Sequence, residues 1–268
     1  AFASNEDGDF DIYRLAIIGD QHVDKLTDNT VLDTQPAFHP TEDNLLLYVS
    51  DEQSPGFTDL YLLDQDALDE PVVRLYDGAG GAYQPAWSAD GSQIAFISTA
   101  NADPDVFLIN ADGSGSPRRL TSSNGIDTEP AYSPDGRSLY FTSDRGGSPQ
   151  IYRMPADGGD ATRVTFGSSY NVSARPSPDG RSLAFITRRE GRYLVAIKNL
   201  ATGAEQLLSD TGREESPSFA PNGRWIMFAT QSGGRDSLMA VTVDGRVKQR
   251  LSSNLGDIRE PSWGPFTR

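Results

Sequence analysis

Nine polar residues lie at the last two positions before the first residue of a repeated motif, and the chemistry that they share is hydrogen bonding through oxygen and nitrogen. They are Gln35, Gln84, Thr128, Glu129, Ser173, Glu215, Ser216, Arg259 and Glu260. Such groups, gathered round one opening, form a binding surface for a protein partner. Carboxylate oxygens are also the ligands that Ca²⁺ prefers. Glu129, Glu215 and Glu260 are therefore candidates for a calcium site, with bound water as the plainer alternative.

The motif that carries these residues occurs six times. It reads Pro, a small residue, an aromatic residue and a turn resembling Pro-Asp-Gly, as in EPAYSPDG at 129–136 and SPSFAPNG at 216–223. The first Pro falls at positions 36, 85, 130, 217 and 261, and Ala174 takes its place in the fourth copy. A period near 44 residues indicates a repeated supersecondary unit.

Each repeat is predicted to contain four short strands. In the third copy the apolar runs after the motif are Ser138–Ser143, Gln150–Met154 and Thr162–Phe166. They are rich in β-branched and aromatic residues and are bounded by turn-forming residues, which is typical of strands. Asp-Gly or Asn-Gly pairs join most of the strands, because Gly adopts positive φ without strain. The repeat is therefore predicted to be an antiparallel meander.

An all-β, six-bladed β-propeller of four-stranded antiparallel blades is the expected fold, because a radial arrangement buries both faces of every sheet. Residues 1–15 align without a gap to residues 140–154, so the chain begins inside a blade. We expect the ring to be closed by the C-terminal strand, in the motif copy at 260–266, joining the N-terminal blade. Residues 1–268 would form a single domain. The nine polar residues would then converge on one mouth of the axial channel.

The net charge of −15 is unevenly distributed. Residues 1–110 contain 21 acidic and three basic residues, whereas residues 111–268 contain 17 acidic and 20 basic ones. Divergence of an old repeat array or a functional acidic face would account for the difference. A join between two parents best explains its sharpness. We therefore expect a chimera, natural or engineered, with a junction near residues 110–111.

Several classes of protein are disfavoured by composition. The chain has no Cys, which excludes disulfides and thiolate metal sites. It has no apolar run near 18 residues, so a membrane span is not expected. Its basic pairs, Arg118-Arg119 and Arg188-Arg189, lack interleaved aromatic residues, and nucleic-acid binding is not expected of so acidic a protein. No signal peptide is recognisable, and the sequence is interpreted as a mature or recombinant monomer.

Residues 111–268, and most clearly 120–268, resemble the C-terminal blades of the TolB family, the periplasmic propellers of the bacterial Tol–Pal system. The resemblance rests on EPAYSPDGRSLYFTSDRGG, SPSFAPNGRWIMFAT and the terminal EPSWGPF, in that order. Residues 1–110 resemble TolB-like repeats more generally, and their Asp-rich character departs from the pattern. No α/β domain like the one that precedes the family's propeller is expected in residues 1–268. The resemblance implies a periplasmic location and a mouth that binds the peptidoglycan-associated lipoprotein or colicin-like peptide segments.

Catalysis finds little basis in the sequence. There are two histidines, His22 and His39, and no G-x-S-x-G elbow. The expected function is that of a non-enzymatic TolB-like propeller without a cofactor, a chimeric or engineered scaffold with at most residual protein binding at the mouth. Two alternatives stay open: a natural interaction module that binds the lipoprotein, and a hydrolase or lyase using mouth carboxylates. The acidic run at 5–11 lacks the spacing of an EF-hand and is predicted to be an ordinary loop.

Overall fold

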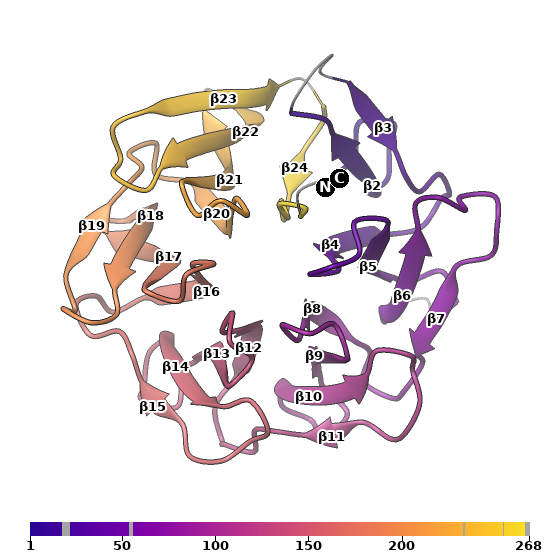
Figure 1. Cartoon of the computed structure of the whole chain (residues 1–268), viewed down its shortest axis with the longest axis horizontal. Helices are drawn as coiled ribbons and strands as arrows, with labels where there is room; N and C mark the ends of the chain where they lie inside the picture. The colour runs from indigo at the N-terminus through magenta and orange to yellow at the C-terminus, as the bar shows by residue number, and fades with distance from the viewer. Residues whose placement is uncertain (18–21, 54–55, 233, 254, 266–268) are drawn as a thin grey trace.

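Six four-stranded antiparallel sheets stand radially around a common axis in the computed structural model (Figure 1). The structure describes residues 1–17, 22–53, 56–232, 234–253 and 255–265. Within each sheet, strands that follow one another in sequence are hydrogen-bonded neighbours, and this is the predicted meander. The six-bladed propeller is therefore confirmed. None of the described residues forms a helix that is long and apolar enough to cross a membrane.

The blades are numbered here from the first complete one. Blade 1 contains β4 (Asp33–Phe38), β5 (Leu45–Ser50), β6 (Asp59–Asp64) and β7 (Val73–Tyr76). Blade 2 contains β8 (Tyr83–Trp87), β9 (Gln93–Ser98), β10 (Asp105–Asn110) and β11 (Arg118–Arg119). Blade 3 contains β12 (Asp127–Tyr132), β13 (Ser138–Ser143), β14 (Gln150–Pro155) and β15 (Thr162–Arg163).

The other three blades follow the same order. Blade 4 contains β16 (Asn171–Pro176), β17 (Ser182–Arg189), β18 (Arg192–Asn199) and β19 (Glu205–Leu207). Blade 5 contains β20 (Glu214–Phe219), β21 (Trp225–Ser232), β22 (Arg235–Thr242) and β23 (Lys248–Ser253). Blade 6 combines both ends of the chain, in the order β24 (Ile258–Arg259), β1 (Phe2–Ser4), β2 (Asp11–Leu15) and β3 (Val23–Lys25).

Blade 6 closes the ring as predicted, although the closing strand begins earlier than the motif suggests. Ile258 pairs with Ser4 and Arg259 with Ala3, just before the predicted segment at 260–266. The bulge that follows interrupts the ladder, and pairing resumes at Ser262, whose N–H donates to the carbonyl of Ala1 and whose carbonyl accepts from its N-terminal amine, both at 2.8 Å. Phe266, the last residue of the motif, lies outside the described residues.

The core lies between the blades because the second strand of each blade alternates its side chains between two neighbours. In β13, Leu139 and Phe141 pack in a cluster with blade 2, whereas Tyr140 packs against Leu183 and Phe185 of blade 4. Alternation with a period of two places successive side chains on opposite faces of a strand. Each blade thus packs against a neighbouring blade on both faces, and this packing holds its first strand at the axis.

A bulge recurs in the first strands and aims the motif residues at the axis. In β12 the pairing skips from Thr128 to Ala131, and the same irregularity occurs in the first strands of blades 1, 2, 4 and 5. The residue before the repeated proline position has positive φ in all six blades. The values are 57° at Gln35, 50° at Gln84, 56° at Glu129, 57° at Ser173, 50° at Ser216 and 52° at Glu260. A bulge redirects a side chain locally, here toward the mouth.

Candidate functional site

A chain of hydrogen bonds runs from blade to blade around the mouth. The N–H of Gln35 donates to the carboxylate of Glu260 at 2.8 Å, and the N–H of Gln84 donates to the side-chain oxygen of Gln35. The N–H of Glu129 donates to the side-chain oxygen of Gln84 at 2.9 Å. The N–H of Ser173 then donates to the carboxylate of Glu129 at 2.7 Å. We call this arrangement the mouth ring: each bulge residue accepts from the amide of the next.

The mouth ring is interrupted after Ser173. Among the described residues, no side chain accepts a hydrogen bond from the amides of Ser216 or Glu260. The preceding bulge residues are Ser173 and Ser216, and a serine side chain is too short to repeat the bond that Gln or Glu makes in the other blades. We call the part of the mouth between these three bulge residues, Ser173, Ser216 and Glu260, the ring gap.

A cavity of about 810 Å³ opens at the mouth, and the ring gap lies in its wall. Seven of the nine residues predicted for the mouth line this cavity, and Gln35 and Thr128 do not. Gln35 belongs to the mouth ring on the other side of the axis, whereas Thr128 pairs with Thr142 in the blade 3 ladder. The structure thus gathers seven of the nine predicted residues at one cavity, which opens toward blades 4 to 6.

The walls of the cavity contain residues that the sequence reasoning missed. The hairpins β17–β18 and β21–β22 are built from strands of eight residues, whereas the equivalent strands of blade 3 have six. The longer hairpins and the loops beside them supply Tyr170, Tyr193, Arg213, Gln231 and Asp236 to the lining. The rings of Tyr170 and Tyr193 meet edge to face at 5.4 Å. The sequence feature that could have indicated these residues is the Arg188-Arg189 pair, because it forms the two extra residues at the end of β17.

The cavity is rich in negative charge. Burial raises the pKa of Glu215, and the nearby carboxylate of Glu260 raises it further. Burial likewise raises the pKa of Glu260, against the hydrogen bonds from Gln35. Arg259 opposes both effects, and its guanidinium lies 4.8 Å from the ring centre of Phe10. The glutamates are therefore held close enough to repel each other, and the carboxylate of Glu215 accepts no hydrogen bond from the described residues.

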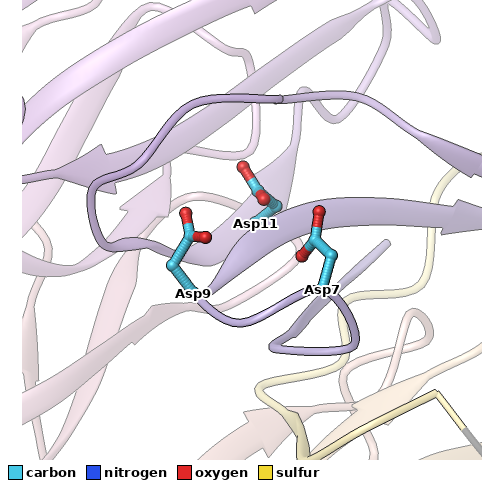
Figure 2. A group of neighbouring side chains, drawn as sticks. All are labelled: Asp7, Asp9 and Asp11. Atoms are coloured by element: carbon cyan, nitrogen blue, oxygen red, sulfur yellow. The ribbon is translucent and has the colours of Figure 1, made fainter.

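The predicted calcium ligands are not brought together as one site. Among the described residues, the carboxylates close enough to share an ion are those of Asp7, Asp9 and Asp11, whose oxygens lie within 4.8 Å of one another (Figure 2). Glu129, Glu215 and Glu260 do not form such a group. The carboxylate of Glu129 is instead engaged by Ser173 and by the hydroxyl of Thr142 at 2.6 Å. Calcium at the mouth stays a prediction.

The acidic run at 5–11 forms the loop between β1 and β2, as predicted, and ends on Asp11, the first residue of β2. Two of its carboxylates contact a lysine. The ammonium group of Lys25 contacts Asp7, Asp28 and the buried Asp11, the last at 2.9 Å. These contacts hold the pKa of Lys25 above its usual value and outweigh the effect of burial. None of these residues lines the mouth cavity. The cluster is therefore a structural ion-pair network at the edge of blade 6.

The sequence and the fold of this chain are similar to those of known proteins. The family described as the TolB beta propeller domain matches residues 56–267. The Tol-Pal system protein TolB of Bordetella avium is 54% identical, over 69% of this chain and 52% of that protein. The crystal structure of TolB from Acinetobacter baumannii superimposes with a TM-score of 0.87 at 34% identity, covering 96% of this chain and 63% of that one. The chain thus spans about half the length of the curated relative.

A more distant likeness shows the fold alone. An oligogalacturonate lyase in complex with manganese matches with a TM-score of 0.65 at 15% identity, over 94% of this chain and 73% of that one. At that identity the match carries no chemistry to this chain.

The comparisons give no support to the predicted join between two parents. The family match crosses residues 110–111, and the Acinetobacter structure matches both sides of them. The charge difference between the two parts therefore needs no second parent. Since the family match extends over most of the sequence and the six blades superimpose on a TolB structure, the chain belongs to the TolB β-propeller family.

Proposed function

We propose that this chain is a non-enzymatic protein-interaction module of the Tol–Pal system in the periplasm, and that it binds the peptidoglycan-associated lipoprotein at the mouth cavity. Membership of the TolB family supports the system and the compartment. The observation that carries the site is the one-sided cavity of about 810 Å³, lined by seven of the residues that the repeat directs to the axis. Colicin-like segments would compete for the same cavity.

The shape of the cavity suits a protein segment. It is concave, polar and walled by two tall hairpins, and the tyrosines at its rim supply flat apolar surface. Aromatic and arginine side chains dominate the energy of many protein interfaces. Tyr193 and Arg213, which lie side by side in an isolated parallel bridge, are placed to act as such anchors.

The enzymatic alternative has weaker support. Neither His22 nor His39 lines the cavity. His39 is buried instead in the turn after β4, where its ring accepts a hydrogen bond from the N–H of Glu42 and meets Trp87 edge to face. The hydrolases and lyases among the structural neighbours share less than a fifth of their sequence with this chain, so they support the fold and not the reaction.

Calorimetric titration of this chain with the soluble part of the lipoprotein tests the proposal. We expect saturable binding, and we expect the double variant Glu215→Ala with Arg213→Ala to weaken it at least tenfold. Arg246→Ala, on an exposed turn at the opposite end of blade 5, serves as the matched control and should bind like the parent. Absence of binding would refute the proposed partner. Undiminished binding by the double variant would show that the partner uses another surface.

A further inference from the structure

All six bulge residues present their backbone amides to the mouth in the same way. Their φ values fall between 50° and 57°, so the six residues share one local backbone conformation. In blades 1 to 4 the N–H reaches a side-chain oxygen of the preceding blade. In blades 5 and 6 the equivalent amides belong to Ser216 and Glu260, and the bulge residue of the preceding blade is a serine, whose side chain is shorter than Gln or Glu. Among the described residues, no side chain accepts from these two amides.

Backbone donors that reach no side-chain acceptor among the described residues are suited to bind an oxygen from elsewhere. Both donors belong to residues that line the 810 Å³ cavity, so a group entering the mouth meets them. The geometry of the other four blades shows what fits: a side-chain carbonyl or carboxylate oxygen that approaches from the direction of the preceding blade. A ligand that occupies the ring gap would complete the pattern that Gln35 and Gln84 begin.

The charges of the cavity decide between a neutral and an anionic ligand. Glu129, Glu214, Glu215, Asp236 and Glu260 line the cavity, against two arginines. A further carboxylate would enter a field that is already negative, and like charges brought together without water repel strongly. A neutral carbonyl avoids this cost.

The same cavity also contains a hydrogen-bond acceptor. The carboxylate of Glu215 lines the cavity and accepts no hydrogen bond from the described residues. A lysine would satisfy this carboxylate but would leave the two amides unpaired. A carboxamide serves both, since its carbonyl accepts and its NH₂ group donates.

We propose that the ring gap is a subsite for a carboxamide, the side chain of an Asn or Gln in a partner segment. Its oxygen accepts from the amide of Ser216 or Glu260, and its NH₂ group donates to Glu215. This subsite deepens the proposed function, since it lies in the same cavity. The proposal also assigns Ser173 and Ser216 as specificity-determining residues, because their small size is what keeps the gap open.

The test uses the 268-residue chain labelled with ¹⁵N and three tripeptides with blocked ends, Gly-Asn-Gly, Gly-Asp-Gly and Gly-Lys-Gly. We expect the Asn peptide to shift the amide signals of Ser216 and Glu260 saturably in the millimolar range, and the other two to bind at least fivefold more weakly. The variant Ser173→Gln with Ser216→Gln fills the gap as blades 1 and 2 do. It should fold with an equal or higher Tm and weaken the Asn peptide at least tenfold.

Two further variants serve as a control and as a test of the proposed acceptor. Ser116→Gln, at an exposed serine that also precedes a proline, should bind like the parent, and Glu215→Ala should weaken the Asn peptide several-fold without unfolding the protein. Equal binding of the three peptides, no saturable shift at Ser216 and Glu260, or undiminished binding by the filled variant would overturn the subsite. Lipoprotein binding is read separately: if it persists undiminished in the filled variant, the subsite fails and the proposed partner stands.

Discussion

Glu129 and Ser173 are joined across the boundary between blades 3 and 4, where the amide of Ser173 donates to the carboxylate of Glu129 at 2.7 Å and the hydroxyl of Ser173 donates to the same carboxylate. This contact divides the mouth into two parts. On the side of blades 1 to 3, the polar residues are engaged with one another. On the side of blades 4 to 6, Ser216 and Glu215 keep unused hydrogen-bonding groups toward the cavity.

The first prediction concerns this division. Glu129→Ala removes the acceptor for Ser173 and Thr142, and it should lower the free energy of unfolding by about 2–3 kcal/mol, because buried donors left without acceptors are costly. Glu215→Ala is the matched control on the next blade but one, and it should change stability by less than about 0.5 kcal/mol. Urea unfolding of both variants gives the comparison. Equal losses would mean that the mouth ring contributes nothing specific to stability.

The sequence predicts the blades and their closure because both follow from periodic features. The repeated proline marks the first strand of each blade, and the alternation of residues such as Leu139 and Tyr140 encodes which neighbour each side chain packs against. The position of the mouth follows from the same periodicity. These are properties of residue type and spacing, which a sequence displays directly.

The asymmetry of the site is not encoded in that way. Gln84 and Ser216 occupy equivalent positions, and only the three-dimensional distance between blades shows that Gln spans the boundary while Ser does not. The repeat spacing hides the difference in hairpin length as well. It is 44 residues in blade 3, which has strands of six residues, and 43 and 44 in blades 4 and 5, which have strands of eight and shorter turns between them. Whether the predicted calcium ligands could share one ion is not encoded in the repeat either, since convergence on one axis does not set the distance between carboxylates.

The second prediction concerns closure of the ring. Ile258 is 2% exposed and packs with Phe2, Tyr13 and Leu238 in the cluster that joins blade 6 to blade 5. Ile258→Ala should cost about 2–5 kcal/mol through lost burial and the cavity that it leaves. Val247→Ala removes a similar residue that is 51% exposed and should cost less than about 0.5 kcal/mol. A Tm of Ile258→Ala equal to that of the control would show that the closing strand is dispensable.

The third prediction concerns the lysine inside the acidic cluster. Lys25→Met leaves Asp11, which is fully buried, without its cation, and also releases Asp7 and Asp28. Leaving one partner of a buried ion pair alone is destabilising by about 3–5 kcal/mol. Arg246→Met, which breaks an exposed pair with Asp244, is the control and should stay within about 1 kcal/mol of the parent. Adding Asp11→Asn to Lys25→Met should recover part of the loss, and failure to do so would contradict the electrostatic explanation.

The last prediction concerns pH and rests on two equivalent aspartates. Asp33 and Asp127 begin the first strands of blades 1 and 3, and both are fully buried. Asp127 pairs with Arg145 at 2.8 Å, whereas blade 1 has Glu52 in the place of that arginine. Burial raises the pKa of Asp33 to about 6, against its hydrogen bonds.

The raised pKa fixes the sign of the effect. Between the unfolded pKa of Asp33 and about pH 6, the folded protein binds more protons than the unfolded one, so stability falls as pH rises through this window. Asp33→Asn removes the buried charge and should stabilise the protein at pH 7.5 by about 1–3 kcal/mol, with the gain vanishing near pH 4. Asp127→Asn should destabilise at pH 7.5, because it leaves Arg145 without its carboxylate. Urea unfolding of the three proteins at pH 4.5, 6 and 7.5 checks this, and a gain for Asp33→Asn that did not grow with pH would refute the assignment.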